Sequence, residues 1–179
     1  VMLEESREWN DFCYALVHKF QNDKEYLEFY KKSLKQGRIV YLDNSIFELE
    51  EMFDHDEFAQ WVKELGSINP DNFYYIIPDS LEEKDMTINS LKMFTENHKN
   101  LPGKSIGVVQ GKTYDEIKEC YRFMSENADT IAISFDYSYY VKTRLDERNK
   151  FFSWMYGRQE LIDKLITEGV WNHDKEHHL

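Results

Sequence analysis

Residues 39–45 read IVYLDNS, an apolar run that ends abruptly in three hydrogen-bonding residues. Short runs of β-branched, aromatic and apolar residues are typical of strands that are buried on both faces, as in a parallel sheet. The same pattern recurs along the chain and predicts five strands. They read CYALV at 13–17, IVYL at 39–42, FYYII at 73–77, IGVV at 106–109 and TIAI at 130–133.

Amphipathic segments separate these runs and predict helices. Apolar residues recur at helical spacing over 26–34, 58–65, 86–94 and 117–124, and a last helix is predicted from about Leu145 to Ile166. Thr113 and Glu116 have the spacing of a capping box that opens the fourth helix. Alternating strands and helices indicate an α/β protein with a parallel sheet, either a closed barrel or a doubly wound open sheet. No GxGxxG follows the first run, so a dinucleotide fold has no positive support.

The length and composition of the chain limit its domain number, its cellular setting and its partners. The 179 residues suffice for one domain, and no apolar run approaches the roughly 20 residues of a membrane span. The two cysteines lie far apart without metal-ligand spacing, which favours a reducing cytoplasmic setting. The net charge of −12 argues against a large phosphate-binding surface. A local basic rim, or simply a solvated helix face, could come from Lys142, Arg144, Arg148, Lys150 and Arg158.

Polar residues follow each predicted strand at its carboxyl end, where α/β proteins build their sites. Each of these residues alone could cap the next helix, and Ser80 is well explained in that way. Taken together, they predict a converging polar site. The residues are Asp43, Asn44 and Ser45, then Asp79 and Ser80, then Gln110, Gly111 and Lys112, and finally Ser134 and Asp136.

These residue types suit the recognition of a purine-like base. A carboxylate accepts hydrogen bonds from ring or amino N–H groups, while a carboxamide both donates and accepts. An aromatic side chain such as Phe47 can stack on the face of a base. A second carboxylate can act as general acid/base or stabilise an oxocarbenium-like sugar.

Four short motifs, which together extend over some two thirds of the chain, match a known pattern in order and spacing. YLDNSIFELE at 41–50 is similar to an LxDSGGFQ motif, and Asp79 in YIIPDS is similar to a strand-end Asp. GVVQGK at 107–112 is similar to a VQGG motif, and residues 132–134 weakly match AIGG. In order and spacing these motifs resemble the tRNA-guanine transglycosylase (queuine tRNA-ribosyltransferase) superfamily. The likeness is greatest to short phage-encoded members that are implicated in placing 7-deazaguanine bases into DNA.

The resemblance implies a TIM-type (β/α) barrel and a glycosyltransferase that exchanges guanine for a 7-deazaguanine base in DNA or tRNA. It implies that Asp43 is the acid/base or supporting carboxylate near the sugar, and that Asp79 and Gln110 bind the base edge. The other substrate-binding residues that it implies are Asn44 beside the base, Phe47 stacked on it, Gly111 of the VQG motif, and the Ser134 backbone at the base carbonyl. It further implies a nucleic-acid partner, a possible second subunit, and the host cytoplasm if the protein is phage-encoded.

The chain also departs from the family pattern. Ser45 and Ile46 replace the paired glycines, and Glu48 replaces the Gln, so the pocket lip and the bound base should differ. The family's zinc cluster has no counterpart, and we therefore expect no cofactor. The strand with the nucleophilic Asp would follow a strand that begins near His177. We accordingly expect a single barrel domain over 1–179 whose C-terminal strands are missing.

Two other functions fit the same residues. The first is a non-catalytic or accessory subunit of the same fold, which binds a base or nucleic acid without the nucleophile. The second is a metal-dependent α/β hydrolase that uses Asp43, with Asp79 and Asp136 completing a carboxylate cluster for magnesium. A hydrolase of the GxSxG type is disfavoured because the motif does not occur.

Overall fold

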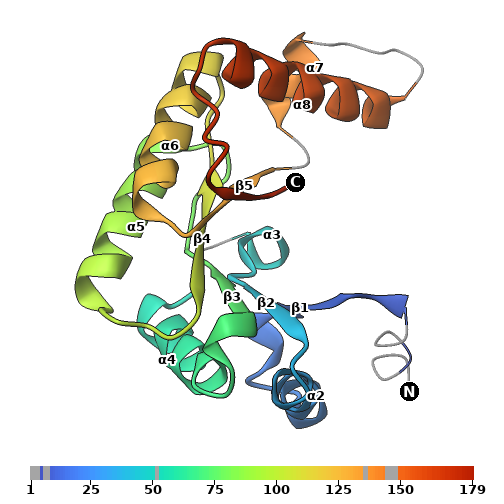
Figure 1. The fold of residues 1–179 in the computed structure, drawn as a ribbon, viewed down its shortest axis with the longest axis vertical. Coiled ribbons are helices and arrows are strands. Elements are labelled where there is room, and N and C mark those ends of the chain that lie inside the picture. Colours follow the sequence, from blue (N-terminus) through green and yellow to red (C-terminus); the bar gives the residue numbers. More distant parts are fainter. Residues whose placement is uncertain (1–4, 6–8, 51–52, 135–136, 144–148) are drawn as a thin grey trace. The chain divides into compact units, whose positions relative to one another are not determined.

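The computed structural model describes residues 5, 9–50, 53–134, 137–143 and 149–179, in which strands and helices alternate along the chain (Figure 1). The strands are β1 (Phe12–Leu16), β2 (Ile39–Asp43), β3 (Phe73–Ile76), β4 (Lys104–Val109), β5 (Thr130–Ile133) and β6 (Glu176–His178). The helices are α2 (Lys24–Lys35), α3 (Ile46–Leu49), α4 (His55–Gly66), α5 (Lys84–Asn97), α6 (Tyr114–Asn127), α7 (Ser138–Thr143) and α8 (Lys150–Thr167). Two 3-10 turns, η1 (Val17–Lys19) and η2 (Pro70–Asn72), precede α2 and β3.

The sheet contains six parallel strands in chain order, β1-β2-β3-β4-β5-β6. The predicted α/β class, the five predicted strands and their order are therefore confirmed. The sixth strand, expected near His177, is β6, which pairs in parallel with β5. In the part of the chain that the structure describes, β1 and β6 are the two ends of the strand order. These residues thus form an open sheet and not the closed barrel that the resemblance implies.

The chain divides into two compact units. The first comprises Val1–Pro78 and Lys92–Ile106, and the second comprises Asp79–Leu91 and Gly107–Leu179. The single domain expected from the length of the chain stays a prediction.

In the first unit, α2 packs on β1 and β2, while α4 packs on β3 and α2. Val40 and Leu42 of β2 are fully buried. Helix α2 starts at an Asp23 side chain that accepts a hydrogen bond from the Tyr26 N–H. It ends before Gly37, whose φ of 75° is the left-handed conformation favoured by glycine. The helices predicted over 26–34 and 58–65 are confirmed.

Aromatic residues of the first unit also form a ladder across the strands. Tyr14, Tyr41, Tyr74 and Lys104 are register partners on β1 to β4. Neighbouring tyrosine rings lie 6.4 and 4.9 Å apart between centroids. The Lys104 ammonium donates a hydrogen bond of 2.8 Å to the Tyr74 hydroxyl. In β1 and β2 the ladder tyrosine stands between two buried residues, Cys13 and Ala15 in β1 and Val40 and Leu42 in β2.

In the second unit, α6 packs on β5 and α7 packs against α8 (Figure 1). The capping box predicted for α6 is confirmed, because Thr113 and Glu116 hydrogen-bond reciprocally. The last long helix begins at Lys150 and not near Leu145, and α7 was not predicted. Helix α7 is six residues long, so it offers too few turns for its periodicity to be recognised. Within the described ranges, no helix is long and apolar enough to cross a membrane.

Candidate functional site

Two of the predicted site residues in the second unit are directly paired. Asp79 lies shortly after β3, and Gln110 follows the last residue of β4. The Gln110 Nε2 donates a 2.6 Å hydrogen bond to the Asp79 Oδ2. Both side chains are almost fully buried, with 4% and 2% of their surface exposed. The pair is therefore a buried polar contact between residues that the sequence places 31 positions apart.

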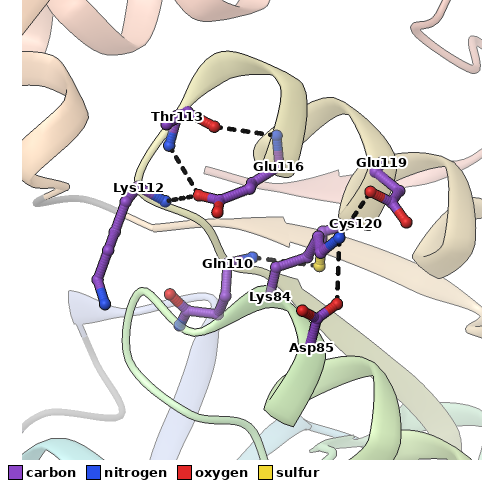
Figure 2. Close-up of polar contacts among 8 residues, drawn as sticks. All are labelled: Lys84, Asp85, Gln110, Lys112, Thr113, Glu116, Glu119 and Cys120. Carbon is purple, nitrogen blue, oxygen red and sulfur yellow. Dashed lines mark hydrogen bonds and ion pairs between the residues drawn. The ribbon is translucent and has the colours of Figure 1, made fainter.

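Further contacts fix the orientation of Gln110. Its Oε1 accepts a hydrogen bond of 2.8 Å from the Glu82 N–H. Its backbone N–H points to the Sγ of Cys120 on α6 at 3.3 Å, while its carboxamide extends away from that thiol (Figure 2). The carboxamide thus has one donor and one acceptor in use. Its second N–H and the second oxygen lone pair are the groups that a ligand could engage.

The loop that presents Glu82 has an unusual backbone. Glu82 has a φ of 57°, a left-handed conformation that costs a non-glycine residue roughly 1–2 kcal/mol. The conformation is held from both sides, because the Glu82 N–H bonds Gln110 and its carboxylate accepts the Ser138 N–H. Backbone strain of this kind clusters at binding and catalytic sites. Glu82 therefore joins the candidate site, although nothing in the sequence indicates its left-handed conformation.

A pocket of about 230 Å³ lies beside the pair, within the second unit. This volume is below the roughly 300–1,000 Å³ of pockets for drug-sized ligands, so it suits a fragment about as large as one base. Two of the predicted residues, Gln110 and Ser134, line the pocket. The lining consists of Leu81, Glu82, Gln110, Ser134 and Tyr137.

Tyr137 is a pocket residue that the sequence reasoning missed. Its side chain is 2% exposed, and its ring centroid lies 5.1 Å from that of Tyr140. Burial raises the pKa of the Tyr137 hydroxyl well above its ordinary value, and the nearby Asp79 charge acts in the same direction. Tyr137 is therefore a neutral phenol at physiological pH and can donate a hydrogen bond. The one available indication in the sequence was its position a few residues after a predicted strand.

The predicted residue Gly111 has a clear packing role. A Cβ on Gly111 would lie 2.9 Å from both the Glu116 Cβ and the Ile117 N. The Glu116 carboxylate accepts the N–H groups of Lys112 and Thr113 at 2.8 and 3.0 Å (Figure 2). The hydrogen bond from the Lys112 N–H is the main cause that lowers the pKa of Glu116. Gly111 thus lets the start of α6 approach the end of β4.

Ser134 contributes more than its place in the pocket wall. Its backbone carbonyl accepts a hydrogen bond of 2.9 Å from the Tyr140 hydroxyl. The predicted contact between the Ser134 backbone and a base carbonyl would use the N–H group of Ser134 and stays a prediction. Asp136, the third carboxylate of the alternative magnesium site, lies outside the described residues.

In the first unit, Asp43 ends β2 and is half-buried. The Tyr14 hydroxyl donates to its Oδ2 and the Ser45 N–H to its Oδ1, both at 2.5 Å. Burial raises the pKa of Asp43 above the ordinary 3.8, while these two hydrogen bonds and His18 oppose the rise. Because desolvation prevails, Asp43 holds its proton to a higher pH than an exposed Asp, as a general acid requires.

The two other predicted residues of the first unit differ in exposure. Asn44 is buried, its Nδ2 donates to the Ile77 carbonyl at 3.1 Å, and its Oδ1 accepts the Ile46 N–H at 3.0 Å. Those bonds give Asn44 a structural role in ending β2. Phe47, on the short helix α3, is 67% exposed. An exposed ring leaves its face available for stacking.

The predicted residues thus fall into two groups. Asp79, Gln110, Gly111 and Ser134 belong to the second unit, whereas Asp43, Asn44 and Phe47 belong to the first. The convergence of both groups on one ligand stays a prediction.

The described ranges contain no group of three His, Cys, Asp or Glu residues that could hold a metal ion. Of the predicted basic rim, Arg144 and Arg148 lie outside the described residues, and the Lys150 Nζ lies 4.6 Å from the Trp154 ring centroid.

Comparisons of the chain with protein-family models, with curated proteins and with solved structures gave no significant match.

Proposed function

We propose that this protein is a guanine-transglycosylase-like enzyme that exchanges guanine for a 7-deazaguanine base in nucleic acid. The observation that carries the proposal is Gln110, which lines a base-sized pocket while its carboxamide donates a hydrogen bond to the buried Asp79. The motif resemblance assigns the same two residues to the base edge. The proposal therefore combines the order of the motifs with a contact that the sequence alone does not give.

A guanine-like base presents N–H donors and a carbonyl acceptor on its edge. In the proposed complex, the Asp79 carboxylate accepts from these N–H groups. The free N–H of Gln110 donates to the carbonyl or a ring nitrogen, while the Glu82 N–H keeps the carboxamide from rotating. Each well-aligned bidentate contact of this kind contributes roughly 1–3 kcal/mol of discrimination.

Asp43 supplies the proton chemistry in this proposal. Departure of a base from its sugar needs a proton donor and stabilisation of an oxocarbenium-like sugar. A carboxyl group with a raised pKa is suited to donate that proton to the departing guanine as its bond to the sugar breaks, and the ionised form can then support the sugar. The ring N–H of the incoming base then bonds to the same sugar carbon and returns its proton to Asp43, so the exchange leaves the carboxyl group as it began. Tyr14 and the Ser45 N–H hold the carboxyl group in one orientation.

Incorporation of radiolabelled guanine and of a labelled 7-deazaguanine base tests the proposal. The full chain is incubated with duplex DNA, single-stranded DNA or tRNA, and the label retained in nucleic acid is counted. We expect incorporation into one class of nucleic acid that depends on Asp43, Asp79 and Gln110. Base binding without any incorporation would favour an accessory binding subunit, and the absence of both would refute the proposal.

A further inference from the structure

Tyr137 is a residue of the pocket wall, and its hydroxyl is a buried polar group without a hydrogen-bond partner among the described residues. The backbone N–H of Ser134 acts on this oxygen by lowering the pKa, yet it does not meet hydrogen-bond geometry. An N–H group cannot accept a hydrogen bond in any case. The hydroxyl proton of Tyr137 is therefore without an acceptor in this part of the chain.

Tyr140 is a matched neighbour with the opposite arrangement. It is fully buried, like Tyr137, and the two rings are in contact. Its hydroxyl, however, donates to the Ser134 carbonyl at 2.9 Å. The same segment thus contains one tyrosine whose hydroxyl is satisfied by the fold and one whose hydroxyl is not.

An unsatisfied buried hydroxyl destabilises a fold, and phenylalanine would fill the same space without that cost. Such groups are rare in native proteins, and each one needs an explanation. Here the pocket provides it, because Tyr137 lines the same 230 Å³ space as Gln110. A ligand in this space is within reach of both residues.

The charges of the side chains that line the pocket limit the class of ligand that it can bind. Glu82 contributes a carboxylate, the Asp79 carboxylate is hydrogen-bonded to Gln110, and none of the described lining residues is basic. A phosphate or carboxylate group would therefore be repelled from the pocket. An uncharged ligand with both N–H and carbonyl-type groups matches the carboxylate, the carboxamide and the phenol.

We propose that Tyr137 is a ligand-binding residue whose hydroxyl donates a hydrogen bond to an acceptor atom of an uncharged, nucleobase-sized ligand held beside Gln110. This inference rests on the proposed function in taking a base as the occupant. It adds a residue that the family resemblance does not assign. It also excludes the phosphate of the nucleotide from this pocket.

Equilibrium binding of free guanine and 7-deazaguanine to the full chain tests the inference, together with thermal unfolding without ligand. Tyr137→Phe should weaken binding about three- to tenfold, the effect of losing one hydrogen bond to a ligand. It should leave the melting temperature unchanged or raise it, because an unsatisfied group is removed. Tyr140→Phe is the matched control, which should lower the melting temperature while base affinity stays near that of the wild type.

Either of two results with Tyr137→Phe would overturn the inference. One is unchanged base affinity in Tyr137→Phe. The other is a fall in its melting temperature as large as that of Tyr140→Phe, which would show that the hydroxyl has a structural partner. If the wild type binds neither base, the inference and the proposed function both fail. If base binding by the wild type depends on Tyr137 but the base is never incorporated into nucleic acid, only the proposed function fails.

Discussion

The Gln110 Nε2 and the Asp79 Oδ2 lie 2.6 Å apart in a buried hydrogen bond that joins the ends of two strands. Each residue satisfies part of the other's hydrogen-bonding capacity before any ligand arrives. The pair is therefore preorganised, and a base would add to an existing contact without ordering two free side chains. Such preorganisation reduces the entropic cost of binding.

Replacing either partner should weaken base binding. We expect Asp79→Ala and Gln110→Ala each to reduce the affinity for free guanine by about tenfold or more, in keeping with the usual value of a bidentate contact. Equilibrium dialysis with labelled base measures this directly. Asp85→Ala is the control, since its side chain is 90% exposed and forms a surface ion pair with Lys84. Equal affinity in all three variants would contradict the assignment.

Asp43→Asn separates a chemical role from a structural one. Asn keeps the size of the side chain and caps a turn as well as Asp does, but it cannot transfer a proton. If Asp43 is the acid/base residue, base exchange should fall by about 10²–10⁴ while the fold stays intact. Single-turnover incorporation assays and circular dichroism measure the two effects. Near-normal exchange in a folded variant would show that Asp43 only shapes the turn.

The raised pKa of Asp43 also predicts a dependence of stability on pH. The native state binds more protons than the unfolded state once the pH exceeds the ordinary carboxyl pKa of 3.8. The contribution of Asp43 to the free energy of unfolding is therefore fully present below pH 3.8. It is lost as the pH rises through the raised native pKa. Asp43→Asn lacks this titration, so its melting temperature should rise relative to that of the wild type as the pH increases. A difference that stays constant with pH would exclude a raised native pKa.

Gly111→Ala tests the packing of α6 on the end of β4. The added Cβ would lie 2.9 Å from the Ile117 N, so the start of the helix must shift. Overpacking of this kind typically costs about 1–3 kcal/mol, which urea unfolding should detect. Lys112→Ala is the neighbouring control, because its surface ion pair with Glu83 contributes little. Equal stability of the two variants would show that this helix start tolerates a side chain.

The sequence predicts the regular elements well because their patterns are local. Five strands were recognisable from runs of four or five apolar residues, and α6 from its capping box and apolar spacing. Gly37 marked the end of α2 because a left-handed residue there favours glycine. These features depend on neighbours within a few positions, so one chain without relatives suffices to predict them.

The sequence located parts of the site but not their contacts. The position of Gln110 and Asp79 after strands pointed to the carboxyl edge of a parallel sheet, and that expectation needs only the alternation of strands and helices. It did not predict that the two side chains bind each other. Nor did it separate Gly111 and Asn44, which have clear packing and hydrogen-bonding roles, from the residues that line the pocket.

Only the tertiary structure decided which residues form the pocket. Glu82 bonds a Ser138 that lies 56 positions away, and its left-handed backbone depends on that contact and on Gln110. Tyr137 and Tyr140 look alike in the sequence, yet within the described residues the Tyr140 hydroxyl bonds a carbonyl and the Tyr137 hydroxyl has no partner. The residue types and their order determined the strands, the helices and the polar edge, because periodicity and capping act over short distances. The partners of each buried polar group depend on segments far apart in the chain, so they are fixed only when the folded chain brings those segments together.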